Sequence, residues 1–174
     1  GDLSVELAIT TNAVFLDKFL PLFKEVGLNS INISLDTLVK SKFNRITKRS
    51  AFNTVSSNIH KALSQGFYVK INAVALRNIN EDEITDFVEW TRDLPIHVRF
   101  IEFMPFVGNQ WKSEKVLTYK EILDRISVVY PIEKLNDSTN STAKSYQVPG
   151  FKGTFAVIST ITDPFCTNCN RMRL

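Results

Sequence analysis

Two cysteines, Cys166 and Cys169, are separated by two residues near the end of the sequence and are the only cysteines in it. A C-x-x-C pair can bind a metal ion or an iron–sulfur cluster, form a redox disulfide, or supply half of a zinc site. Such metal and cluster sites usually have three or four protein ligands, so two thiols are an incomplete set. Ligation is favoured over redox chemistry, because a redox pair normally opens a helix after the first strand of a thioredoxin-like unit.

Four cations stand where they could meet an anion. Arg171 and Arg173 follow the cysteine pair at alternate positions, which suggests a phosphate or carboxylate close to the thiols. Lys70 and Arg99 lie inside otherwise apolar segments of strand character. A charge there costs free energy unless it meets a ligand, a protein partner or solvent. Solvent exposure, or pairing with Asp36 or Glu102, is therefore the alternative interpretation of these two residues.

Short apolar segments alternate with amphipathic segments of helical spacing through the first hundred residues. The pattern predicts strands at 5–10, 30–35, 69–76 and 97–103, and helices at 16–26, 51–65 and 81–90. Such alternation implies parallel strands, in an open doubly wound sheet or in a closed or partial barrel. Polar residues recur at or near the strand ends, where a barrel forms its ligand site, and this favours a partial TIM-type α/β barrel.

The pattern changes after residue 104. A helix is predicted at 118–129, with Thr118 and Glu121 forming a capping box. A β-hairpin is predicted over 146–161, leading into the cysteine pair. We therefore expect two regions, βα units over 1–104 and a C-terminal region over 105–174.

Composition narrows the class of protein. A hydrophobic content of 44% and a charged content of 22% are typical of a soluble globular protein. A net charge of +3 permits an anionic ligand but is far below the basic charge of most nucleic-acid binders. There is no apolar run long enough for a membrane span, and a single C-x-x-C argues for a reducing compartment. Neither nucleic acid nor a membrane is expected as a partner.

Five motifs occur in one order and at one set of spacings. They are Thr10-Thr11-Asn12, Asn32-Ile-Ser-Leu-Asp36, Val69-Lys-Ile-Asn72, Arg99-Phe-Ile-Glu-Phe-Met-Pro105 and Phe165-Cys-x-x-Cys-Asn-Arg-x-Arg173. In this combination the chain resembles the GTP 3′,8-cyclase family of radical S-adenosylmethionine enzymes, also called the MoaA or molybdenum cofactor biosynthesis protein A family. The resemblance covers essentially the whole chain. Ala13 and Thr167 depart from it, since glycine is common at both positions, and Ala13 narrows the backbone options of a turn.

The resemblance implies an incomplete TIM-type barrel with two [4Fe–4S] clusters and bound S-adenosylmethionine. The first cluster would need a C-x-x-x-C-x-x-C motif, which these 174 residues do not contain. The chain thus resembles an internal fragment, and we expect the fragment alone to be inactive. The second cluster would use three cysteines, of which Cys166 and Cys169 match the first two. Ser34 and Met104 would contact S-adenosylmethionine, and the residues facing GTP would be Thr10, Lys70, Arg99, Arg171 and Arg173.

The implied activity is that of a lyase in molybdenum cofactor biosynthesis, which converts GTP to (8S)-3′,8-cyclo-7,8-dihydroguanosine 5′-triphosphate. The resemblance identifies no catalytic side chain. It further implies a homodimer, a cyclic pyranopterin monophosphate synthase that acts on the product, and a location in bacterial cytoplasm or the mitochondrial matrix. Two alternatives stay open: another radical S-adenosylmethionine enzyme with an auxiliary cluster, and a zinc-stabilised binding module with structural cysteines.

Overall fold

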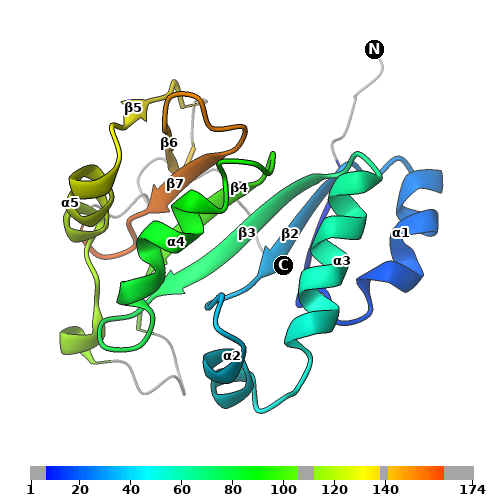
Figure 1. Ribbon diagram of the computed structural model, residues 1–174, viewed down its shortest axis with the longest axis horizontal. Helices are drawn as coiled ribbons and strands as arrows, with labels where there is room; N and C mark the ends of the chain where they lie inside the picture. The colour runs from blue at the N-terminus through cyan, green and yellow to red at the C-terminus, as the bar shows by residue number, and fades with distance from the viewer. Residues whose placement is uncertain (1–6, 106–111, 138–140, 163–174) are drawn as a thin grey trace. The chain divides into compact units, whose positions relative to one another are not determined.

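The computed structural model describes residues 7–105, 112–137 and 141–162. Within these ranges it is an α/β structure with seven strands and five α-helices (Figure 1). The chain divides into two compact units, Gly1–Asn72 and Ala73–Leu174, and strand β3 (Tyr68–Ala75) runs across the boundary. The division predicted at residue 104 concerns sequence regions rather than these units, and it stays a prediction.

The first unit is built on parallel strands. β1 (Ala8–Thr11), β2 (Ser30–Ser34) and β3 are ordered β1-β2-β3, and both neighbouring pairs are parallel. The connecting helices are α1 (Leu16–Glu25), α2 (Lys40–Thr47) and α3 (Phe52–Ser64). In Figure 1, α3 lies in front of the strands of this unit. The predicted alternation of parallel strands and helices is confirmed here, and α2 is an addition that the sequence pattern did not predict.

Every second residue of β2 and β3 forms the core of this unit. Ile31, Ile33, Val69 and Ile71 are fully buried. From the helices, buried side chains meet this apolar face: Leu16, Leu20, Val55, Ile59 and Ala62. β-branched residues suit a pleated surface, and burying each such side chain contributes about 1.5–3 kcal/mol. The predicted end of the first helix is also confirmed, because Gly27 has a φ of 73° and donates its N–H to the Lys24 carbonyl.

The second unit combines parallel and antiparallel pairing. β4 (His97–Glu102) pairs parallel with β7 (Thr154–Ile158), which pairs antiparallel with β6 (Lys144–Gln147). A short β5 (Glu133–Lys134) completes the order β4-β7-β6-β5. The predicted hairpin is therefore β6–β7. The parallel pairing of β7 with β4 was not predicted from the sequence.

Helices of the second unit pack on an aromatic core. They are η1 (Glu81–Glu83), α4 (Ile84–Glu89), η2 (Ser113–Lys115) and α5 (Tyr119–Val129). Phe87 of α4 meets Phe100 of β4 edge-on, with ring centroids 6.1 Å apart. The predicted capping box at Thr118 and Glu121 is confirmed at the start of α5. Among the described residues there is no helix with the length and apolarity that a membrane span requires.

Candidate functional site

A row of polar side chains crosses the sheet of the first unit. Thr10 of β1 is the register partner of Asn32 in β2, and Asn32 is the partner of Lys70 in β3. Register partners in neighbouring strands point to the same face, so a hydroxyl, an amide and an ammonium group stand side by side. Strands lie about 4.8 Å apart, which places the two ends of this row about 10 Å from each other. We call Thr10, Asn32 and Lys70 the polar row.

The face that carries the polar row is distinct from the apolar face. Along β3, Tyr68, Lys70 and Asn72 are exposed or half-buried, whereas the residues between them are fully buried. The Lys70 ammonium lies 5.0 Å from the centroid of the Tyr68 ring, a distance at which a cation is attracted to an aromatic face. The amide of Asn32 donates to the Ile9 carbonyl at 3.2 Å. This face can therefore offer both charge and hydrogen bonds to a polar ligand.

Ser34 lies apart from the polar row, at the C-terminal end of β2. It lines a depression of about 240 Å³ together with Asn12, Thr47 and Arg49, and Phe43 supplies an apolar wall. A hydroxyl, an amide and a guanidinium beside an apolar surface suit one part of a small polar molecule. Arg49 was not among the residues predicted from sequence, and no motif or spacing in the chain points to it.

A strained turn follows β1 beside this depression. Ala13 is fully buried and has a φ of 60°, in the left-handed region that costs residues other than glycine about 1–2 kcal/mol. The N–H of Ala13 donates to the Thr11 hydroxyl at 3.0 Å, and its carbonyl accepts from the buried Asn58 amide at 2.8 Å. The sequence analysis expected Ala13 to narrow the backbone options of this turn, because glycine is common there. The positive φ of Ala13 is a conformation that glycine adopts more easily.

Arg99 and Met104 belong to the second unit. Arg99 lies in the middle of β4, half-buried, and is the register partner of Ala156 in β7. Met104 follows the end of β4 and is 44% exposed. Cys166, Cys169, Arg171 and Arg173 lie outside the described residues. Within the described ranges, no group of three or more His, Cys, Asp or Glu residues could hold a metal ion.

Glu102, at the end of β4, is a fully buried carboxylate that collects several donors. Its Oε2 accepts from the backbone N–H groups of Thr160, Ile161 and Thr162 at 2.9, 2.9 and 3.1 Å. Its Oε1 accepts from the Tyr119 N–H at 2.6 Å and from the Thr162 hydroxyl. Burial would raise the pKa of Glu102, but the hydrogen bonds from Thr162, Ile161 and Tyr119 outweigh it and lower the pKa. Glu102 is therefore an anion at neutral pH.

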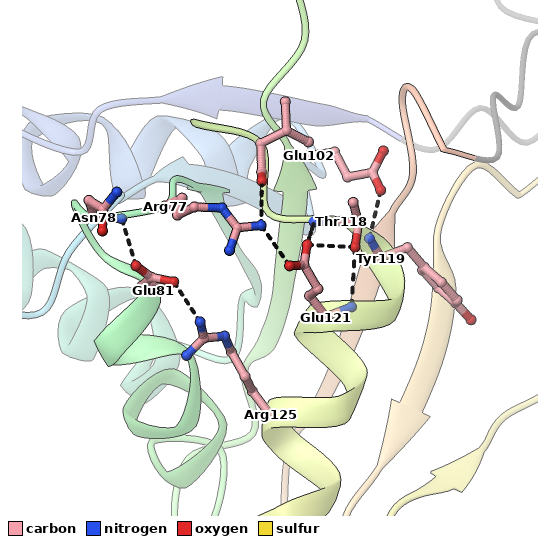
Figure 2. A network of polar contacts seen from close by, with 9 residues as sticks. Arg77, Asn78, Glu81, Glu102, Thr118, Tyr119, Glu121 and Arg125 are labelled. Atoms are coloured by element: carbon pink, nitrogen blue, oxygen red, sulfur yellow. Dashed lines mark hydrogen bonds and ion pairs between the residues drawn. The ribbon is translucent and has the colours of Figure 1, made fainter. Parts of the chain in front are cut away.

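A second carboxylate, Glu121, connects the start of α5 to the loop after β3 (Figure 2). Arg77 donates to Glu121 at 2.6 Å and to the Val116 carbonyl at 3.1 Å. The other Glu121 oxygen accepts from the Thr118 N–H at 2.9 Å and from the Thr118 hydroxyl at 2.7 Å. A parallel contact joins Arg125 to Glu81 at 2.5 Å. These bonds hold the N-terminus of α5, whose first N–H reaches Glu102.

The Glu121 contacts make the second unit sensitive to acid. The hydrogen bond from Arg77, followed by that from the Thr118 N–H, lowers the pKa of Glu121 from 4.5 to about 2. A carboxylate with a lowered folded-state pKa stabilises the fold fully above its unfolded pKa and loses that contribution as the pH falls through the folded value. The window for Glu121 is therefore about pH 4.5 down to about pH 2. Because the side chain is 39% exposed, solvent screening limits the contribution to about 1 kcal/mol.

We expect Glu121→Gln to remove that part of the acid response. The free energy of unfolding, measured by chemical denaturation at about pH 6 and about pH 3, should fall less in the variant than in the parent by roughly half of this 1 kcal/mol, because pH 3 lies within the window. Asp86→Asn, on an exposed part of α4, is the matched control and should leave the difference unchanged. Equal acid responses in the parent and in Glu121→Gln would contradict the assignment.

Comparison with known proteins defines the class to which these features belong. The chain belongs to the radical SAM superfamily, whose profile matches residues 2–91, the part that contains the polar row and Ser34. Residues 96–174 match the family described as Molybdenum Cofactor Synthesis C. The resemblance predicted from the sequence motifs is thus confirmed. Membership of the superfamily implies an iron–sulfur cluster and S-adenosylmethionine.

Similar proteins come from animals, plants and bacteria. The chain is 47% identical over 170 residues to "Molybdenum cofactor biosynthesis protein 1" of Mus musculus, covering 97% of this chain and 27% of that protein. It is 48% identical over 170 residues to "GTP 3′,8-cyclase, mitochondrial" of Arabidopsis thaliana, covering 97% and 44%. It is 40% identical over 171 residues to "GTP 3′,8-cyclase" of Moorella thermoacetica, covering 97% and 53%. The chain therefore spans between about a quarter and a half of these relatives.

Of the residues predicted to form the site, the structure aligns Thr10 and Lys70 in one row and places Ser34 in a depression of the same unit. Sequence reasoning missed Arg49, and it gave no site role to Asn32 or Glu102, although both lie within the motifs quoted above and Glu102 was noted as a polar residue at a strand end. The strict polar–apolar alternation of β2 could have identified Asn32, because the same alternation identified Lys70 on β3.

Proposed function

We propose that this chain is the substrate-binding part of a GTP 3′,8-cyclase, which forms (8S)-3′,8-cyclo-7,8-dihydroguanosine 5′-triphosphate from GTP in molybdenum cofactor biosynthesis. The observation that carries the proposal is the polar row, with the Lys70 cation half-buried on the polar face of a radical SAM sheet. Relatives from Arabidopsis thaliana and Moorella thermoacetica bear the name of this activity.

The residues divide between the two small molecules. Lys70, Arg99, Arg171 and Arg173 neutralise the triphosphate of GTP, and Thr10 supplies a hydroxyl next to it in the row. Ser34 lies in a depression of about 240 Å³, a volume that suits one part of S-adenosylmethionine rather than the whole molecule. Met104, exposed after β4, offers a soft side chain to the same cofactor.

Two [4Fe–4S] clusters complete the proposed enzyme. Cys166 and Cys169 would supply two thiolates to the second cluster, and thiolates are the ligands that such clusters prefer. The remaining ligand and the motif for the first cluster would come from sequence that this chain does not contain. When bound, the first cluster would supply the one electron that cleaves S-adenosylmethionine. The part of this chain is to orient GTP and to exclude water from it.

The partial barrel, the division at residue 104, the homodimer, the downstream synthase and the compartment remain predictions. One feature supports the barrel: β1 and α1 border an apolar groove of about 370 Å³ lined in part by Phe15, Phe19 and Phe23. Phe15 and Phe19 are 59% and 48% exposed, as expected where another βα unit would pack.

The direct test uses a full-length polypeptide that contains this chain together with both cluster motifs. Under anaerobic, reducing conditions with S-adenosylmethionine and GTP, it should form the cyclised nucleotide and 5′-deoxyadenosine in equal amounts, measured by mass spectrometry. Cys166→Ala should abolish the cyclised nucleotide, and ATP in place of GTP is the control substrate. Formation of 5′-deoxyadenosine without any cyclised nucleotide, by a protein with both clusters loaded, would contradict the proposal and favour another radical SAM activity.

A further inference from the structure

We propose that Glu102 is a positioning residue that fixes segment 160–162, and that cluster ligation by the cysteines that follow this segment in the sequence, Cys166 and Cys169, depends on it. The inference rests on the proposed function, since that function gives the cysteines and arginines their roles. It adds a residue that touches neither cluster nor nucleotide and acts through the backbone between them.

The burial of Glu102 needs an explanation. An ionised carboxylate taken out of water costs several kcal/mol unless hydrogen bonds satisfy its oxygens. An apolar residue at the end of β4 would avoid the cost of burying a charge, but it would leave the N–H and O–H groups directed at this position without an acceptor. From the described residues, the Glu102 carboxylate instead accepts five hydrogen bonds, four of them from residues 160–162. Its role therefore lies in what those bonds hold.

Three successive backbone N–H groups converge on one oxygen of Glu102. Successive N–H groups turned toward one anion require a defined backbone conformation, as in the anion-binding concavities called nests. The Thr160 hydroxyl adds a bond to the Glu102 carbonyl at 3.1 Å. Side chain and backbone of Glu102 together thus fix both the position and the direction of segment 160–162.

The frame around Glu102 is itself held in place. Its Oε1 accepts from the first N–H of α5, the end of a helix that favours an anion. The Thr118–Glu121 capping box and the Arg77 contact fix that helix end, as Figure 2 shows. Segment 160–162 is thereby tied to both β4 and α5.

The cysteines follow segment 160–162 closely in the sequence, so the position of this segment matters for them. Cys166 follows Thr162 by four residues in the sequence, and four residues of chain span at most about 14 Å. Arg171 follows Thr162 by nine residues in the sequence. We therefore expect cluster loading and GTP binding to depend on where segment 160–162 is held.

The test measures cluster loading and GTP binding rather than turnover. In a full-length protein whose first-cluster cysteines are replaced by alanine, iron reports the second cluster alone, with about four iron atoms per chain expected. Glu102→Gln places an NH₂ group against the N–H and O–H donors, so iron should fall below half and GTP should bind at least tenfold more weakly by equilibrium dialysis. Thr162→Val should lower both, and Thr162→Ser should restore both to the parent level.

Two controls separate the possible outcomes. Thr154→Val makes the same change at a residue bonded to His97 instead of Glu102 and should keep the parent iron content. Cys166→Ala should lose the iron, and retention of iron by this variant would overturn the proposed function itself. If Cys166→Ala loses iron while Thr162→Val keeps parent iron content and GTP affinity, the positioning role is overturned, whether or not Glu102→Gln folds.

Discussion

Replacing Lys70 by methionine is expected to weaken GTP binding about 100-fold. Methionine keeps the length of the side chain but removes the only charge of the polar row, which lies half-buried on the open face of β3. A hydrogen bond between a cation and a phosphate contributes about 1.5–3 kcal/mol, and the upper part of that range corresponds to a factor of about 100. Isothermal titration with GTP in a full-length protein would measure the loss.

Lys61→Met is the matched control for this prediction. Lys61 belongs to α3, is 51% exposed in its side chain, and forms an ion pair with Asp17 at 3.5 Å. α3 packs on the apolar face of the sheet, so this variant should bind GTP as the parent does. Binding by Lys70→Met within a factor of about two of the parent would show that the row does not receive the nucleotide's phosphates.

Gly153→Ala is expected to destabilise the second unit by about 3 kcal/mol, at the upper end of what overpacking costs. A Cβ at this position would lie 2.3 Å from the Ile96 carbonyl oxygen and 2.6 Å from that of Leu94. Both contacts are with backbone, which cannot rotate away as a side chain can. The Gly153 N–H also donates to the Thr91 carbonyl at 2.9 Å, so a shift would break the start of β7. Denaturant unfolding and hydrogen exchange of β7 would measure the effect.

Gly150→Ala separates steric crowding from backbone strain. Gly150 has a φ of 84°, and a methyl group added there would meet no heavy atom of the described residues within 4 Å. Only the left-handed conformation therefore opposes a side chain at this position, and that conformation costs about 1 kcal/mol. A loss of less than about 1 kcal/mol in Gly153→Ala would contradict the close approach of segment 94–96 to β7.

Much of the fold follows from local pattern. The strands of the first unit, its helices α1 and α3, the capping box of α5 and the β6–β7 hairpin were predicted because each carries its own periodicity or turn residues. α2 was missed because it buries Phe43 alone of its eight residues and so shows no repeating apolar stripe. The parallel pairing of β4 with β7 was missed for a different reason. No local sequence feature of either strand indicates which distant strand it pairs with.

In the candidate site, too, residues with a local sequence signal were identified, whereas their tertiary partners were not. Lys70 was identified because a charge interrupts an apolar strand, and the register later aligned it with Thr10. Glu102 is equally anomalous in the sequence, but its partners lie 58 to 60 residues further along, except for Tyr119. The sequence can show that a charge interrupts an apolar strand and needs hydrogen-bond partners, but it does not show which groups those partners are. For Glu102 those partners are backbone N–H groups that only the tertiary structure brings to the carboxylate.

The two-sided pairing of β7 has a consequence for the order of folding. β7 pairs with β6 across a short hairpin, but its pairing with β4 joins His97 to Thr154, 57 residues apart. Closing so long a loop costs entropy before contacts repay it, and such non-local parallel pairings form slowly. Glu102 can accept its hydrogen bonds from segment 160–162 only after β4 and β7 have paired. We therefore expect iron–sulfur assembly to follow folding of the second unit, the reverse of small zinc domains, in which the metal drives the chain to fold.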